Sequence, residues 1–220
     1  MTLYRFEGFD RLKALIFDFD ETLYFSPTLK RDYVNYVKQT VMDLSGRNEA
    51  EAMALLEEYG FTAGGDKRVS FGSCCEKFGI PKEKWDAYRI GRFFQIDYAS
   101  AVAVDNGLIA GLAGRFRLFL VSNEIEGNLR FKAEKLGIDL APFSVRAPKP
   151  EELKNYRSKA QVYRQIEEEL GCGFPAMMAV GDRFHVDIEP LLELGGCGAE
   201  VHHPDEIAAL FAPLFGERRA

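Results

Sequence analysis

The sequence predicts an α/β fold in which a doubly wound parallel sheet carries an inserted set of helices, and three observations support this. From about residue 106 onward, short apolar runs alternate with helical patterns, which is typical of a parallel sheet. An apolar run at 12–17 shows little alternation, as expected of a strand that is covered on both faces. Between about residues 28 and 92 the pattern is helical and contains no convincing strand.

The composition is that of a globular chain with a full hydrophobic core. Of the 220 residues, 47% are hydrophobic, so one domain with an insertion or two small domains would fit. The net charge of −6 provides no electrostatic footprint for nucleic acid, and we expect no nucleic-acid partner. No apolar run approaches the roughly 20 residues that span a bilayer, and we expect no membrane association.

The cysteines and the first residues indicate a cytoplasmic location. Two of the four cysteines are adjacent and the other two are isolated, a pattern that fits neither a disulfide framework nor a zinc site. Reduced thiols in the cytoplasm are the simplest account of them. The first residues, MTLYRFEGFDR, are polar and lack the apolar segment of a signal peptide. No pattern in the sequence indicates an oligomeric state.

The stretch that follows the first strand predicts a helical domain. Apolar residues recur there at helical spacing. Asn48 and Glu51 have the spacing of a capping box, and Pro81 is suited to the first turn of a further helix. We expect residues 25–103 to form this domain.

The remainder of the chain predicts a core domain of residues 1–24 and 104–220. We expect helices at 108–113, 125–136, 158–170 and 204–215 and through 191–192, strands at 116–121, 143–145, 176–180 and 199–202, and a charged loop at 148–157. Gly137 and Gly171 are suited to end two of these helices. Strands and helices in this order favour a parallel sheet with helices on both faces.

Polar side chains follow three of the predicted strands at the points where the strands end. Asp18 and Asp20 follow the first strand, Ser122 follows the second and Asp182 follows a third. If these strands are parallel neighbours, the three ends lie on one edge of the sheet, where ligands bind in open α/β sheets. A pair of carboxylates invites a divalent cation, and hard oxygen ligands indicate Mg²⁺ rather than zinc. The alternative for the first pair is a helix cap or a solvated turn.

Taken together, the three strand ends carry a family resemblance. The stretch DFDETL resembles the motif DxDx[TV] of the haloacid dehalogenase-like (HAD) hydrolase superfamily. The stretch LFLVSN resembles its second motif, an apolar strand ending in Ser or Thr, and VGDRFHVDI resembles its fourth, GDxxxxD. The first and fourth motifs are specific patterns, whereas the second is weak without them. The resemblance extends over nearly the whole chain and implies a Rossmann-like core with a helical C1 cap between the first two motifs.

The resemblance implies a role for each acidic motif residue. Asp18 would be the nucleophile that forms an aspartyl-phosphate, and Asp20 would protonate the leaving oxygen and later deprotonate the attacking water. Mg²⁺ would be held by Asp18, by Asp182 and by the backbone carbonyl of Asp20. Asp187 would be a further metal ligand or a partner of the ligands.

The resemblance also implies groups that bind phosphate and balance its charge. The Ser122 hydroxyl and the Asn123 N–H would bind phosphate oxygens, with a plain helix cap as the alternative. The family places a lysine before the strand that leads to the fourth motif, and both Lys149, in PKPEEL, and Lys159, at a predicted helix start, are candidates. A helix begun at Lys149 would be about two turns, or about 11 Å, longer and would overshoot the sheet. This favours Lys159.

These expectations favour a magnesium-dependent phosphatase that hydrolyses a small phosphomonoester, with a small phosphorylated metabolite as its partner. Asp20 argues against dehalogenation, because the haloacid dehalogenases of the family lack an acid at this position. The alternatives are a phosphomutase, a phosphonate hydrolase and a non-catalytic protein that binds a phosphate ligand. A phosphonate hydrolase would need a Schiff-base lysine in the cap, for which Lys67, Lys77, Lys82 and Lys84 are available.

Six residues in or beside the motifs have no assigned chemistry. Glu21 occupies a variable position that is often glycine in the family, and Tyr24, Phe25 and Ser26 either line the pocket entrance or pack at a hinge. Arg183 and His185 occupy variable positions of the fourth motif. We expect Arg183 to form salt bridges and His185 to be packed or exposed rather than catalytic.

Overall fold

The computed structural model describes residues 1–61, 71–92, 96–155 and 158–216. Contacts between residues divide the chain into two compact units. The core unit consists of Met1–Phe25 and Ala101–Ala220, and the helical unit consists of Ser26–Ser100. The helical unit therefore interrupts the core unit along the chain.

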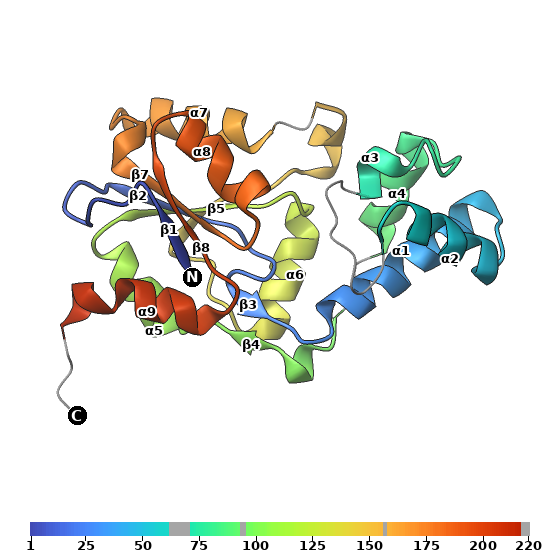
Figure 1. Ribbon diagram of the computed structural model, residues 1–220, viewed down its shortest axis with the longest axis horizontal. Coiled ribbons are helices and arrows are strands. Elements are labelled where there is room, and N and C mark those ends of the chain that lie inside the picture. Colours follow the sequence, from blue (N-terminus) through green and yellow to red (C-terminus); the bar gives the residue numbers. More distant parts are fainter. Residues whose placement is uncertain (62–70, 93–95, 156–157, 217–220) are drawn as a thin grey trace. The chain divides into compact units, whose positions relative to one another are not determined.

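A mostly parallel sheet forms the centre of the core unit (Figure 1). Among the described residues, its six strands lie in the order β1-β8-β7-β2-β5-β6. The strands are β1 (Thr2–Tyr4), β2 (Ala14–Phe17), β5 (Arg117–Val121), β6 (Phe143–Arg146), β7 (Met177–Gly181) and β8 (Cys197–Glu200). Neighbouring strands pair in parallel, except that β1 runs antiparallel to β8. The expected α/β class and its parallel sheet are thus confirmed.

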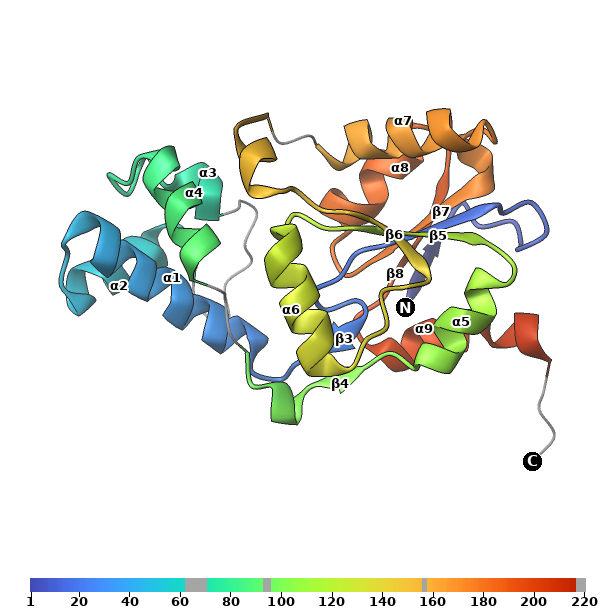
Figure 2. The ribbon, with the colours of Figure 1, turned by 180° about the vertical axis from the view of Figure 1, so that it is seen from behind.

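Helices cover both faces of this sheet (Figure 1 and Figure 2). One face is covered by α7 (Lys159–Leu170) and α8 (Glu189–Glu193), and the other by α5 (Asn106–Ala113), α6 (Glu126–Leu136) and α9 (Pro204–Phe215). Side chains of β2 alternate between the faces. Ile16 lies in a buried cluster with Tyr163 and Leu191 of α7 and α8, whereas the ring centre of Phe17 lies 6.3 Å from that of Phe211 in α9. The sheet is therefore doubly wound, as the sequence predicts.

The middle strand, β2, determines where the polar strand ends meet. It pairs in parallel with β5 on one side and with β7 on the other, so that Phe17 lies opposite both Leu120 and Val180. All of β2 is buried, which explains why its sequence shows no alternation. The carboxyl ends of the three strands therefore lie along one edge of the sheet.

Local signals set the ends of the helices that flank this edge. Ser158 and Gln161 form a complete capping box at the start of α7, so Lys159 is the first residue of that helix. Gly137, with φ of 68°, ends α6, and Gly171, with φ of 59°, ends α7. Glycine is favoured at both positions because this left-handed conformation is costly for other residues.

The described part of the helical unit contains helices and no strand, as expected. Its α-helices are α1 (Leu29–Ser45), α2 (Glu49–Glu58), α3 (Phe71–Cys74) and α4 (Lys82–Gly91), followed by a 3₁₀ helix at Tyr98–Ser100, and residues 62–70 and 93–95 lie outside the described residues. The capping box of Asn48 and Glu51 is confirmed at the start of α2, and Pro81 directly precedes α4. Asp43 of α1 accepts hydrogen bonds from the Tyr88 hydroxyl and from Arg92, each at 2.8 Å. These bonds tie α1 to the end of α4.

The aromatic residues of the helical unit form its own core. Buried side chains from α1, α2, α3 and α4 make one cluster that includes Val41, Leu56, Phe71, Phe78 and Trp85. The rings of Phe71 and Trp85 meet edge to face at 4.9 Å, a favourable arrangement of two aromatic rings. These aromatic residues therefore pack in the core of the helical unit.

Several element boundaries differ from the expected ones by up to two residues, and two elements differ in kind or in register. The segment 148–157, expected as a loop, contains a 3₁₀ helix at Pro150–Asn155 that begins at proline. The last strand is Cys197–Glu200 rather than 199–202. Its register is set by pairing with β7, where Cys197 lies opposite Met178, and apolar content alone does not show such a register.

Three short strands have no counterpart among the predicted elements. β1 pairs Thr2 with Glu200, at the far end of the sequence, so no local pattern indicates it. Strands β3 (Tyr24–Phe25) and β4 (Val102–Ala103) form a separate antiparallel ribbon, in which Phe25 lies opposite Val102. The ribbon joins the two chain segments that lead into and out of the helical unit. Among the described helices, none has the length and apolar character needed to cross a membrane.

Candidate active site

The polar strand ends gather at the carboxyl edge of the sheet. Asp18 directly follows β2, Ser122 directly follows β5 and Asp182 directly follows β7. Asp18 and Ser122 are buried, and Asp182 is half-buried. Because β2 is the common neighbour of β5 and β7, these side chains project from adjacent strands.

Lys159 links two of the buried aspartates. Its Nζ donates hydrogen bonds to Oδ1 of Asp18 and to Oδ1 of Asp187, each at 2.6 Å. All three side chains are at most 4% exposed. Charge-assisted hydrogen bonds of this length offset the cost of burying the ammonium group, because both of its partners are carboxylates. The structure thus hydrogen-bonds Lys159 to Asp18, the predicted nucleophile. The side chain of Lys149, the other candidate, is exposed.

Burial and mutual repulsion shift the acidity of these groups. Burial raises the pKa of Asp18 to about 6, with Lys159 acting to lower this pKa and Asp187 acting to raise it. Burial and the nearby Asp18 carboxylate raise the pKa of Asp182 to about 8. For Lys159, burial favours the neutral amine, but the charges of Asp18 and Asp187 outweigh it and raise the pKa above its usual value. Lys159 therefore remains a cation near neutral pH.

Three carboxylates in this region are close enough to share a cation. Oxygen atoms of Asp18, Asp182 and Asp187 all lie within 4.8 Å of one another. Oδ1 of Asp182 is buried and accepts no hydrogen bond from the described residues, and its contact with Nε of Arg183 is 3.7 Å long. A buried carboxylate oxygen without a donor is costly. The set of oxygen donors therefore fits a hard divalent cation such as Mg²⁺.

Asp187 is held in place through both of its carboxylate oxygens. Besides the bond from Lys159 to Oδ1, Oδ2 accepts the backbone N–H of Arg183 at 3.0 Å. The intervening residues form a π-helical turn at Phe184–Ile188, which folds Asp187 back toward the strand end. Gly181 makes this approach possible, because a Cβ at that position would lie only 2.4 Å from the Cβ of Asp187. In this structure Asp187 positions Lys159 within the carboxylate cluster.

Asp20 belongs to a different set of contacts. Its carboxylate is not part of the three-carboxylate cluster, and Oδ1 accepts hydrogen bonds from Lys132 Nζ at 2.8 Å and from the Tyr24 hydroxyl. Burial favours the protonated form of Asp20, but Lys132 and Tyr24 outweigh it and lower the pKa below its usual value. The proposed contribution of Asp20 to a metal ion is its backbone carbonyl, which stays a prediction.

Lys132 is a site residue that the sequence did not single out. It lies in α6, its side chain is 1% exposed, and its Nζ also lies 3.4 Å from Oε2 of Glu124. The signal that could have found it is a lysine on the apolar face of a helix, three positions after Leu129 and four before Leu136. A charged residue at such a position requires buried partners.

Ser122 and Asn123 lie at the beginning of the segment that leads into α6. Oγ of Ser122 accepts the backbone N–H of Glu124 at 3.1 Å, so this residue does act as a local cap. A hydroxyl that accepts one hydrogen bond keeps its own hydrogen for a further acceptor. Asn123 is exposed beside it. Cap and phosphate contact are therefore compatible roles for Ser122.

Arg183 contacts the carboxylate cluster through its N–H and its side chain, whereas His185 and the described cap lysines contact other residues. Arg183 pairs loosely with Asp182, and His185 is exposed and lies 2.9 Å from Glu189 in α8. Among the lysines considered for a Schiff base, Lys82 pairs with Asp86, Lys77 lies over the ring of Tyr59, and Lys67 lies outside the described residues.

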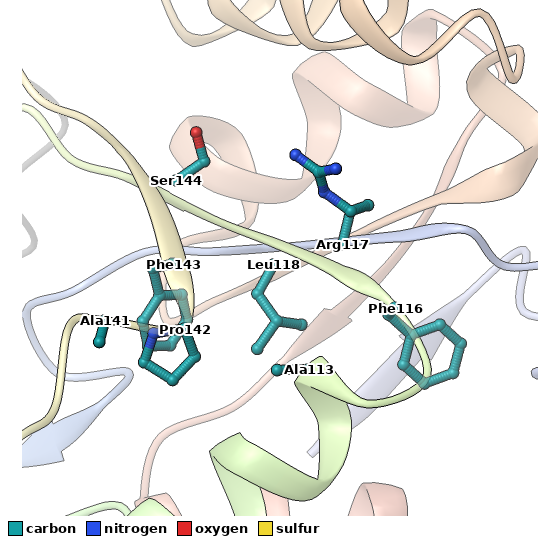
Figure 3. A pocket seen from close by; sticks show the side chains of 8 residues that line it. All are labelled: Ala113, Phe116, Arg117, Leu118, Ala141, Pro142, Phe143 and Ser144. Carbon is teal, nitrogen blue, oxygen red and sulfur yellow. The ribbon is translucent and has the colours of Figure 1, made fainter.

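Two cavities lie at the opposite edge of the sheet. One, of about 370 Å³, is lined by residues at the beginnings of β5 and β6, including Arg117 and Ser144 (Figure 3). None of its lining residues carries a carboxylate. The second, of about 400 Å³, lies beside Arg5 and Cys197. Neither contains a residue that the motifs single out, so the candidate site is the acidic carboxyl edge.

Comparison with known proteins relates this chain to others by structure rather than by sequence. No protein-family sequence model matches the chain. No curated protein sequence matches it significantly.

Solved structures, in contrast, match nearly the whole chain. A HAD phosphatase from Thermococcus onnurineus is similar at 17% identity and a TM-score of 0.59, over 94% of this chain and 100% of that one. The putative HAD hydrolase YfnB from Bacillus subtilis, described as bound to magnesium, is similar at 15% identity and a TM-score of 0.53, over 92% and 100% of the two chains. A predicted phosphoglycolate phosphatase from Haemophilus somnus is similar at 18% identity and a TM-score of 0.53, over 88% and 86%. The chain thus has the fold of the HAD-like hydrolases.

Proposed function

We propose that this chain is a magnesium-dependent phosphatase that hydrolyses a small phosphomonoester through an aspartyl-phosphate on Asp18. One observation carries the proposal: Asp18, buried at the end of the central strand, lies 2.6 Å from Lys159 and within 4.8 Å of the carboxylates of Asp182 and Asp187. Lysine and a carboxylate cluster around one aspartate suit the transfer of a dianionic phosphoryl group. The phosphatases and the magnesium-bound hydrolase among the similar structures support the same conclusion.

The first half of the reaction transfers the phosphoryl group to the protein. A carboxylate oxygen of Asp18 forms a bond to phosphorus while the ester P–O bond breaks. The leaving oxygen takes a proton from the carboxyl group of Asp20, so that the substrate's alcohol departs neutral. Lys159 stays bound to Oδ1 of Asp18 and balances the negative charge that the phosphoryl group brings.

The second half returns Asp18 to its starting state. The Asp20 carboxylate accepts a proton from a water molecule, whose oxygen attacks phosphorus. The bond between phosphorus and Asp18 then breaks, and inorganic phosphate is released. Asp20 ends this half protonated and is ready to act as the acid in the next cycle.

Other groups of the edge bind the substrate's phosphate. The Ser122 hydroxyl and the Asn123 N–H lie at the segment leading into α6 and would donate to phosphate oxygens. A bound Mg²⁺, held by Asp18, Asp182 and the backbone carbonyl of Asp20, would supply positive charge to the phosphoryl oxygens. The helical unit would serve as a C1 cap that gives the enzyme its substrate preference, and a capped site favours small phosphorylated metabolites in the cytoplasm.

The test is phosphate release from a panel of phosphorylated sugars, nucleotides and small acids. Turnover with Mg²⁺ is expected to stop with EDTA and to fall at least about 10³-fold in Asp18→Asn. Asp10→Asn changes an exposed aspartate of the core unit and is the matched control, for which turnover is expected to be unchanged. If the folded wild-type protein binds Mg²⁺ but releases phosphate from no member of the panel, the proposal is wrong.

A further inference from the structure

Lys132 is a buried cation that the reaction as described does not use. Its side chain is 1% exposed, and it lies in the interior of α6 rather than at a helix end. Burying an ammonium group is costly unless acidic partners compensate it. Its partners include Asp20, at 2.8 Å, and Glu124, at 3.4 Å. Asp20 is the residue on which both proton transfers depend.

The contacts on Asp20 are made to one side of its carboxylate. Lys132 and the Tyr24 hydroxyl both donate to Oδ1. Oδ2 accepts no hydrogen bond from the described part of the chain. Two donors from different elements, β3 and α6, therefore fix the plane of the carboxylate and leave Oδ2 as the oxygen available for proton transfer.

The position of Lys132 is itself fixed by neighbouring groups. Its second partner is Oε2 of Glu124. The other oxygen of that carboxylate, Oε1, accepts hydrogen bonds from the Ile125 N–H at 2.9 Å and from Asn128 at 3.1 Å. Lys132, Asn128 and Glu124 thus form one connected set along α6 and the segment before it. Such a supported contact holds a side chain more accurately than a solvated one.

We propose that Lys132 is the positioning residue of the acid–base aspartate, which holds Oδ1 of Asp20 so that Oδ2 faces the proton transfer. This inference rests on the proposed phosphatase function and concerns the orientation of Asp20. Lys132 acts through the side chain of Asp20, and its carboxylate partners, Asp20 and Glu124, lie outside the cluster of Asp18, Asp182 and Asp187.

A positioning role predicts a dependence on the leaving group. An alkyl phosphate releases an alkoxide that must be protonated as its bond breaks, whereas p-nitrophenyl phosphate releases a stable phenolate without a proton. Because kcat/KM reports the transfer to Asp18, the ratio of kcat/KM between the two esters measures the contribution of the acid. A general loss of structure would lower both values alike.

The experiment measures kcat/KM for both esters, with Mg²⁺, in the wild-type protein, Lys132→Met and Lys132→Arg. We expect Lys132→Met to lose about 10- to 100-fold on the best alkyl phosphate but to stay within about threefold on p-nitrophenyl phosphate. Lys132→Arg, which keeps the cation, should recover part of the alkyl activity. Lys135→Met removes an exposed lysine of the same helix and is expected to change neither value.

A second background keeps the inference testable if Lys132→Met folds poorly. In Asp20→Asn the acid is already absent, so adding Lys132→Arg should cost no further activity toward either ester. Equal losses on both esters, or a further loss in the Asp20→Asn background, would overturn the inference while wild-type turnover keeps the phosphatase function. No turnover of either ester by the wild-type protein would overturn both.

Discussion

Two buried lysines lie near the carboxyl edge of the sheet, and each is bound by two carboxylates. Lys159 lies 2.6 Å from Asp18 and from Asp187, and Lys132 lies 2.8 Å from Asp20 and 3.4 Å from Glu124. Each lysine lowers the pKa of its aspartate, but the net shifts at the two sites are opposite. Asp18 has a pKa raised to about 6, whereas the pKa of Asp20 is lowered.

The difference follows from the balance of charge around each lysine. Burial opposes ionisation of both aspartates. The side chain of Asp18 is 4% exposed and faces the further carboxylates of Asp182 and Asp187, whereas that of Asp20 is 32% exposed and is bound by two donors. The first site therefore has an excess of negative charge, which a divalent cation would balance. In the second site one lysine faces two carboxylates, those of Asp20 and Glu124, so the excess of negative charge is smaller.

The largest expected effect comes from breaking the first site. Lys159→Met leaves Asp18 and Asp187 without their cation, and we expect activity to fall about 10²- to 10³-fold. Because a buried pair that loses one partner is strongly destabilised, the free energy of unfolding without metal should fall by about 3–5 kcal/mol. Steady-state kinetics and urea unfolding measure the two quantities. Lys149→Met, at the exposed alternative, should change neither, and a loss confined to that variant would transfer the role to Lys149.

A smaller effect distinguishes the two sites by pH. The pKa values of Asp18 and Asp182 are raised in the folded protein, to about 6 and about 8, so between about pH 4 and pH 8 the folded state binds more protons than the unfolded state. The free energy of unfolding without metal should therefore fall as pH rises through this window, and Mg²⁺ should counteract the fall. Urea unfolding in EDTA and in Mg²⁺ measures it.

Two matched variants sharpen this second prediction. At pH 8 without metal, Asp182→Asn should raise the free energy of unfolding by about 1 kcal/mol or more, because it removes a carboxylate that the fold disfavours. Asp20→Asn should lower the free energy of unfolding. The pKa of Asp20 is lowered in the folded protein, so its carboxylate stabilises the fold at any pH above the usual pKa of an aspartate. Changes of the same sign in both variants would contradict the proposed difference in charge balance.

The smallest expected effect concerns the residue after Asp20. Glu21 has φ of 56°, a left-handed conformation that is costly for a residue with a side chain. Glu21→Gly is expected to raise the free energy of unfolding by about 0.5–1 kcal/mol, measured by urea unfolding in Mg²⁺. Glu21→Gln removes the charge but keeps the strained backbone. A gain in the glutamine variant equal to that in the glycine variant would assign the effect to charge instead.

Much of the fold could be predicted because its signals are local. The uninterrupted apolar run of β2, the capping boxes at Asn48 and Ser158 and the glycine after α7 each depend on residues close in sequence. The strand β1 could not be predicted, because its partner β8 lies at the other end of the chain and its own three residues have no distinctive pattern.

The candidate site divides in the same way. Asp18, Ser122 and Asp182 were found because each directly follows a recognisable strand. Lys159 could be favoured because helix length relates its position to the sheet. Lys132 was missed, because its partners Asp20 and Glu124 belong to separate segments and only the folded chain brings them together. A buried charge without a local partner is a sign of such long-range pairing.

The ribbon of β3 and β4 has an evolutionary consequence. Because Tyr24 pairs with Ala103 and Phe25 with Val102, the two ends of the interruption are held side by side by the core unit's own backbone. Closing a long loop adds little entropic cost once its ends are fixed. Residues 26–100 could therefore be exchanged for any module with adjacent termini, and the acidic edge, which belongs to the core unit, would keep its residues.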